Sequence, residues 1–112
     1  MRRLQQGDVI LKQISKIPER AKKVSGNVLA EGEHTGHFHA LCQKKVGFAR
    51  QEKVRGLSFF KDDKGNSFVK LTEPLELLHQ EHNPISVSPG VYEIGIVKEY
   101  DHFAEGARNV AD

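Results

Sequence analysis

The sequence predicts an all-β fold, and two observations carry the prediction. Glycine, proline and short polar clusters interrupt the chain about every ten residues, a spacing typical of short strands. No stretch has the apolar periodicity of an amphipathic helix. The chain has 112 residues, enough for one domain and too few for two, so we expect a single β domain over residues 1–112. Seven to eight short strands favour a small barrel or a two-sheet sandwich, including a jelly-roll or cupin-like variant.

In the first half of the chain, short apolar runs predict three strands. They cover residues 9–14, 28–31 and 37–42. The polar stretch 15–27 contains Pro18 and predicts a loop or a short helical turn. Gly32 and Gly36 indicate a bend between the second and third strands. Residues 43–55 mix five basic side chains with apolar ones, and predict either an exposed strand or a basic loop.

In the second half, the clearest signal is a hairpin. The β-prone runs 57–60 and 68–71 flank the Asp- and Gly-containing turn 62–66, a pattern typical of a tight hairpin connection. The segment 74–78 begins with a proline, which limits it to a sheet edge or to a strand start. After the turn at Ser88-Pro89-Gly90 we expect a last strand. Its alternation sets Tyr92, Ile94, Ile96 and Tyr100 on one face and Glu93 and Glu99 on the other.

Composition is that of an ordinary folded domain, with 38% hydrophobic and 29% charged residues. No apolar run approaches the ~20 residues of a membrane span, and no apolar stretch of signal-peptide length follows the basic start. The single cysteine, Cys42, cannot form an internal disulfide. We therefore expect a cytoplasmic protein with no membrane association.

Charge is unevenly distributed between the two halves of the chain. Residues 1–55 carry twelve Lys or Arg and five Asp or Glu, and residues 56–112 carry five and ten. If the halves interleave in one fold, the charges mix on its surface. If they form separate basic and acidic faces, self-association into a homo-oligomer or binding of an anion is favoured.

Five of the six histidines lie in two short clusters, at 34–39 and 79–82. In a strand, His37 and His39 share a face, and such a pair can present two imidazoles to one divalent transition metal such as zinc. A strand end turning into a loop before Pro84 could bring the second pair together. We therefore expect a metal or ligand site at His37, His39, His79 and His82, with Glu33, His34 and Glu81 as additional candidates.

Two other interpretations of the histidines stay open. With Thr35 and nearby basic side chains, they could bind a phosphate or a nucleotide, and Lys44, Lys45 and Arg50 are the candidate anion-binding residues. They could also be incidental surface residues. The cupin pattern expects a Glu soon after His-x-His, whereas Cys42-Gln43-Lys44 follows here. Nucleic acid is a less favoured partner, because the acidic second half opposes a polyanion.

Several motifs, in order, resemble those of a family of small uncharacterised bacterial and phage proteins. They are Gln6-Gly7-Asp8-Val9, Thr35-Gly36-His37-Phe38-His39, the run 78–85, Pro89-Gly90-Val91-Tyr92-Glu93, Glu99-Tyr100-Asp101 and the run 108–112. The resemblance spans most of the chain outside residues 43–66. It implies that His37, His39, His79 and His82 belong to family motifs, whereas His34 and His102 match less clearly. It implies no activity.

Three hypotheses for function follow. The first, which we favour, is a small ligand- or metal-binding accessory domain with a histidine-lined site. The second is a metal-dependent enzyme with a cupin-like site, for which Glu81 and then Glu33 are the candidate acid or base residues. The third is a structural or assembly protein of a phage or bacterial particle. The first two require the two histidine pairs to converge.

Overall fold

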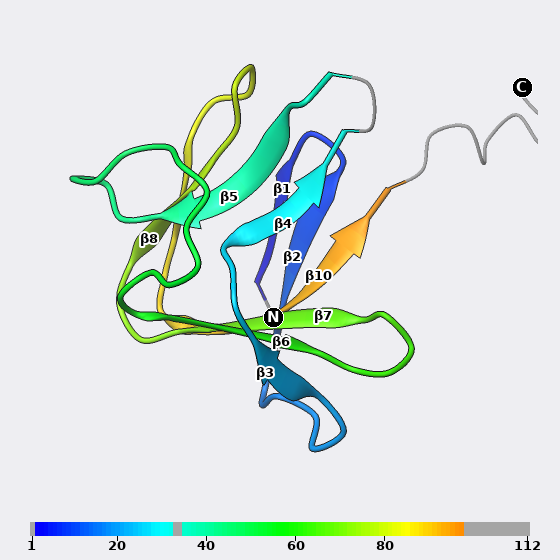
Figure 1. The fold of residues 1–112 in the computed structure, drawn as a ribbon. Coiled ribbons are helices and arrows are strands. Elements are labelled where there is room, and N and C mark those ends of the chain that lie inside the picture. The colour runs from blue at the N-terminus through cyan, green and yellow to red at the C-terminus, as the bar shows by residue number, and fades with distance from the viewer. Residues whose placement is uncertain (1, 33–34, 98–112) are drawn as a thin grey trace, which may run out of the picture.

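The computed structural model describes residues 2–32 and 35–97, which form two antiparallel sheets (Figure 1). One sheet has six strands in the order β1-β2-β10-β7-β6-β3, and the other has four in the order β4-β5-β8-β9. Within these residues every regular element is a strand. The all-β prediction is confirmed, and two separate sheets match the sandwich rather than a closed barrel.

The ten strands of the described residues are short, as expected. Their bounds are β1 Arg3–Gln6, β2 Val9–Ile14, β3 Lys22–Val24, β4 Val28–Glu31, β5 Phe38–Cys42, β6 Leu57–Lys61, β7 Ser67–Leu71, β8 Leu75–Leu78, β9 Ile85–Val87 and β10 Gly90–Ile96. Residues 43–55 contain no strand, so the basic-loop alternative holds there. Pro74 directly precedes β8, an inner strand between β5 and β9.

Three of the ten strands lie in segments for which no strand was expected, because β1 and β3 lack an apolar pattern and β9 is very short. β1 has a single apolar residue, Leu4, and its buried residue is the polar Gln6. β3 is exposed at all three positions. β9 has only three residues and follows Pro84. Each is an edge strand of its sheet, where one neighbour supplies the backbone hydrogen bonds and little burial is needed.

The apolar core lies between the two sheets. Its fully buried members come from both, including Leu11, Val69 and Tyr92 of the six-stranded sheet and Leu41 and Leu77 of the four-stranded sheet. They alternate with more exposed positions along β2, β7 and β8, the period-2 pattern of a strand with one buried face. Burial of these faces therefore holds the sandwich together.

Loop 43–55 is attached to the four-stranded sheet by one buried side chain. The Asn27 amide nitrogen donates hydrogen bonds to the carbonyls of Leu41 (3.1 Å) and Ala49 (2.9 Å), and its oxygen accepts one from the Gln51 backbone (2.8 Å). Asn27 is completely buried, so every polar atom of its amide needs such a partner. The loop is thereby held beside β5.

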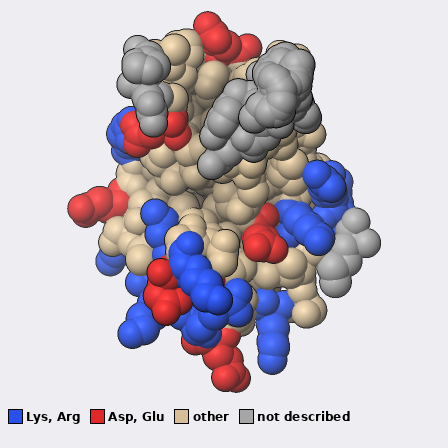
Figure 2. Space-filling model, turned by 90° about the vertical axis from the view of Figure 1, so that its right-hand side faces the viewer, with Lys and Arg blue, Asp and Glu red and all other residues tan. Residues whose placement is uncertain are grey.

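Both sheets contain strands from both halves of the chain, so the basic and acidic halves interleave. Figure 2 shows the result on one face, where Lys and Arg side chains stand among Asp and Glu side chains in the lower part of the view. No helix of the described residues is long and apolar enough to span a membrane.

Three segments meet at one end of the sandwich, uppermost in Figure 1. They are the tight turn between β1 and β2, the start of β5, and the loop between β8 and β9. The turn has two residues, Gly7 and Asp8, with Gln6 paired to Val9. Gly7 has a φ of 58°, in the region that glycine occupies without strain. This end carries the histidines.

Candidate functional site

Strand pairing aligns the two histidine pairs. In the β5–β8 register, Ala40 lies opposite Leu78 and Leu41 opposite Leu77. The preceding residue on β5 is His39 and the following residue after β8 is His79, and their ring centroids are 4.3 Å apart. The sequence could not predict this register, because the two segments are about forty residues apart and many alignments satisfy their apolar patterns.

The structure brings all four candidate histidines into one cluster. His79 is central, with ring centroids 4.3 Å from His39, 4.7 Å from His82 and 5.5 Å from His37. His39 and His82 are 5.9 Å apart. The side chain of Phe38 lies on the other face of β5, where it stacks on Phe48, as strand alternation predicts. The two pairs therefore converge, as a shared site requires.

The most buried histidine has its tautomer set by Gln6. The Gln6 amide nitrogen donates to the carbonyls of Leu77 (2.8 Å) and Asn83 (2.9 Å). The Gln6 oxygen is therefore the atom that faces His39 Nδ1, at 2.8 Å. An amide oxygen only accepts, so Nδ1 of His39 carries the proton and donates it. In the neutral ring, Nε2 then holds a lone pair.

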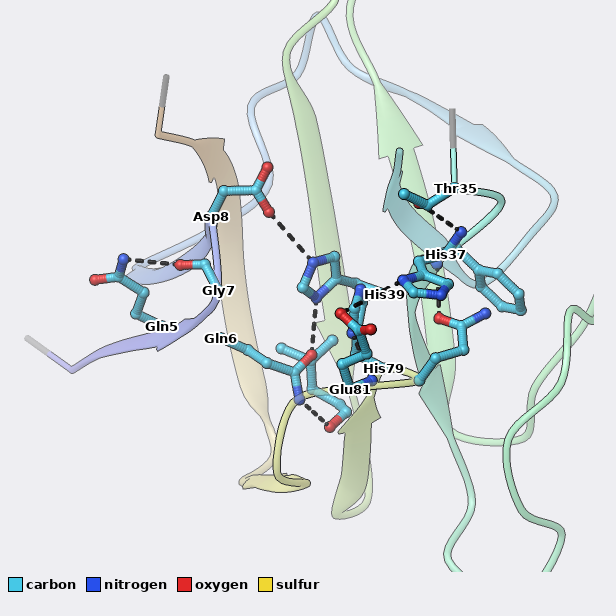
Figure 3. Close-up of polar contacts among 12 residues, drawn as sticks. Gln5, Gln6, Gly7, Asp8, Thr35, His37, His39, His79 and Glu81 are labelled. Atoms are coloured by element: carbon cyan, nitrogen blue, oxygen red, sulfur yellow. Dashed lines mark hydrogen bonds and ion pairs between the residues drawn. The ribbon is translucent and has the colours of Figure 1, made fainter. Parts of the chain in front are cut away.

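That lone pair faces a carboxylate. His39 Nε2 lies 3.3 Å from Asp8 Oδ1 (Figure 3). Burial lowers the pKa of His39, the charge that His79 would carry lowers it further, and only the Asp8 carboxylate opposes them. A neutral His39 is therefore favoured near pH 7. Two acceptor atoms then face each other, an arrangement that a cation between them would stabilise.

His79 has a different role from His39. Its Nδ1 accepts a hydrogen bond from the Glu81 backbone N–H at 3.0 Å, so the neutral ring carries its proton on Nε2. Burial, followed by the charges that His82 and His37 would carry, lowers the pKa of His79. As placed, His79 offers a donor to the cluster and orients Glu81.

His82 closes the cluster on the side of the β1–β2 turn. A Cβ atom on Gly7 would lie 2.6 Å from His82 Nε2, so the ring packs directly on the glycine backbone. A hollow of about 420 Å³ beside it is lined by Gln5, Gly7, Asp8, His82 and Val97. The Asp8 side chain is 56% exposed, so solvent reaches one side of the Asp8–His39 pair.

The model of a domain of unknown function, DUF8820, matches residues 5–96 of the chain. The chain belongs to this family. The DUF8820 segment contains every described residue of the cluster, from Gln6 to His82, which agrees with the expected membership of an uncharacterised family. No curated protein and no solved structure matches the chain.

Two residues of the DUF8820 cluster were not predicted as site residues, namely Gln6 and Asp8. Both lie in the six-stranded sheet or its first turn, whereas the histidines lie in or beside the four-stranded sheet. A signal for them was present. Gly7-Asp8 is a two-residue connection of the type found in hairpins, and Gln6-Gly7-Asp8 is part of the resemblance noted above. Their meeting with His39 is tertiary and could not be read from spacing.

The other candidates lie apart from the four rings or outside the described residues. Arg50 binds Glu31 through both terminal nitrogens, at 3.3 and 2.8 Å. Its guanidinium also lies 4.3 Å from the Phe38 ring centroid, on the opposite face of β5 from His39. Lys44 and Lys45 line a separate hollow with Glu73. Glu33 and His34, like His102, lie outside the described residues.

Glu81 is the one additional candidate that the structure places at the cluster. Its carboxylate Oε1 lies 3.7 Å from His37 Nδ1. In the described part of the DUF8820 chain, no group of three or more His, Cys, Asp or Glu side chains has the geometry to hold a metal ion. The cluster as it stands therefore consists of two histidine–carboxylate pairs, with His79 and His82 beside them.

Proposed function

We propose that the protein is a small binding domain whose histidine cluster takes up a divalent transition-metal ion. His39 Nε2 and the Asp8 carboxylate serve as the first two ligands. The observation that carries the proposal is their 3.3 Å separation, combined with a proton on the opposite ring nitrogen of His39.

The separation agrees with joint coordination of one ion. Zinc lies about 2.0–2.1 Å from an imidazole nitrogen and about 2.0–2.2 Å from a carboxylate oxygen. At the tetrahedral angle, two such ligands are about 3.4 Å apart, close to the distance between His39 and Asp8. Water completes the shell, and the exposed side of Asp8 gives the ion its path from solvent.

Gln6 supports the same proposal from behind the ring. A metal-binding histidine usually donates its second ring N–H to a carbonyl or carboxylate, which fixes the tautomer and orientation of the ligand. Gln6 does this for His39 while both of its own amide hydrogens are bound to carbonyls. A nitrogen ligand with a carboxylate favours zinc, nickel, copper or iron over magnesium and calcium, which prefer oxygen.

The proposal is tested by titrating zinc into metal-free protein in a calorimeter at neutral pH. We expect stoichiometric binding and release of heat. Loss of an outer partner of a metal ligand typically lowers affinity roughly 10- to 100-fold. Asp8 is a ligand itself in this proposal, so Asp8→Asn should weaken binding by roughly tenfold or more. Asp63→Asn, at an exposed carboxylate in the β6–β7 turn, is the matched control and should change nothing.

A second proton, on Nε2 of His39, would also pair with the Asp8 carboxylate, without any metal. The zinc titration distinguishes this ion pair from a metal site. If zinc does not bind, or if Asp8→Asn binds it as tightly as the unaltered protein does, the metal function is wrong and the contact is an internal ion pair.

A further inference from the structure

A second histidine–carboxylate pair lies in the same cluster. His37 Nδ1 is 3.7 Å from Glu81 Oε1, and the ring of His79 neighbours both His37 and His39. The pair arises from the same strand register as the first contact, because His37 precedes His39 by two residues on one side and Glu81 follows His79 by two on the other. His37 and His39 thus lie on one side of β5, whereas Asp8 reaches His39 from the β1–β2 turn.

The backbone around this second pair is held by other groups, which leaves its own ligand atoms available. Thr35 Oγ1 accepts from the His37 backbone N–H at 3.1 Å, and Gln80 Oε1 accepts from that of Phe38 at 2.9 Å. His79 Nδ1 accepts from the Glu81 backbone N–H. None of these bonds uses the His37 ring or the Glu81 carboxylate.

We infer that the cluster holds two divalent transition-metal ions, the second of them bound between His37 Nδ1 and the Glu81 carboxylate. This inference rests on the proposed function. Two ligand bonds of about 2.1 Å can span up to about 4.2 Å, so a separation of 3.7 Å allows one ion to contact both atoms at an angle wider than the tetrahedral one.

Charge and exposure give the order of binding. The carboxylates of Asp8 and Glu81 each lie next to an imidazole ring, and their negative charge offsets part of the charge of two cations. The side chains of His37 and Glu81 are 32% and 70% exposed, whereas that of His39 is 5% exposed. The second site is therefore more solvated and binds its ion more weakly than the Asp8–His39 site.

The number of ions per chain tests the inference. Metal-free protein is titrated with cobalt(II), and binding is followed by calorimetry together with visible absorption, which reports on cobalt coordination. We expect two equivalents, with the second weaker. Glu81→Gln, which preserves the size of the side chain, should bind only the tighter ion, and Asp8→Asn should bind only the weaker one.

Glu19→Gln, at an exposed carboxylate in the loop before β3, is the matched control and should bind two ions. Thermal unfolding of each variant verifies that it is folded. A single equivalent in the unaltered protein that Asp8→Asn abolishes would overturn this inference and leave the proposed function intact. Two equivalents in Glu81→Gln would also overturn it. If cobalt and zinc both fail to bind, the proposed function fails with it.

Discussion

β5 and β8 are paired along one register, but the two ends of that pairing differ in chemistry. At one end, Leu41 lies opposite Leu77, and both are completely buried in the core. At the other end, His39 and His79 are neighbours, and His39 contacts polar groups of the first hairpin. The same two strands thus supply apolar packing at one end and imidazole nitrogens at the other.

The difference shows where the stability of the protein comes from. Burying a leucine side chain contributes about 1.5–3 kcal/mol, whereas one hydrogen bond contributes about 0.5–1.5 kcal/mol net. The apolar end therefore carries most of the free energy of folding. The histidine end contributes less, and its buried polar atoms need hydrogen-bond partners. His39 Nε2 and the Asp8 carboxylate face each other there and are the atoms that the proposed function assigns to a ligand.

The largest loss of stability is expected from Leu77→Ala. Removing a fully buried leucine side chain leaves a cavity and typically costs about 2–5 kcal/mol. Denaturant unfolding followed by circular dichroism measures it. Val46→Ala, at a side chain that is 56% exposed, is the control and should change stability by less than about 0.5 kcal/mol. Equal stability of the two variants would mean that the sheets are not held by this core.

A smaller loss of stability, with a larger loss of function, is expected from Gln6→Leu. The change keeps the approximate volume but leaves the His39 N–H without its acceptor, at about 1–3 kcal/mol for one unsatisfied buried group. It also removes one hydrogen bond from each of the Leu77 and Asn83 carbonyls. Zinc affinity should fall roughly 10- to 100-fold, as for other outer partners of metal ligands. Arg3→Leu, on the exposed face of the same strand, is the control. Unchanged zinc affinity in Gln6→Leu would show that Gln6 does not orient His39.

The mildest perturbation is a change of pH on the metal-free protein. The pKa values of His39 and His79 are both lowered in the folded state, chiefly by burial. The unfolded chain therefore binds more protons, and stability is fully present above the unfolded pKa of about 6.5. It falls as the pH drops from there towards the folded values. Urea midpoints at a series of pH values measure this, and His79→Gln should reduce the slope. Stability that rises on acidification would contradict the shifts.

The sequence predicted the fold well where strands are apolar and less well where they are polar. β2 and β4 have the predicted bounds, and the hairpin of β6 and β7 agrees within a residue at each end. β1 and β3 were not predicted, because their sequences, Arg-Leu-Gln-Gln and Lys-Lys-Val, bury little and carry no alternating pattern. Edge strands of this kind depend on a partner that local sequence does not show.

For the candidate site, spacing could indicate which histidines share a strand face, and it named all four that the structure brings together. It could not indicate their neighbours. Asp8 and His39 are thirty-one positions apart, and their contact depends on how one sheet stacks on the other. Gln6 was missed for a related reason, since a glutamine in a polar segment usually lies in solvent.

The Gln6 side chain also links the two sheets through hydrogen bonds. Among the described strands, β1 pairs with β2 alone, yet the Gln6 amide extends across the sandwich to carbonyls at the end of β8 and in the loop that follows it. If β1 separates from β2, the hydrogen bond from His39 to Gln6 is lost, while the apolar core can remain packed. Local unfolding of this one edge strand would thus release the orientation of His39 in a chain that is otherwise folded.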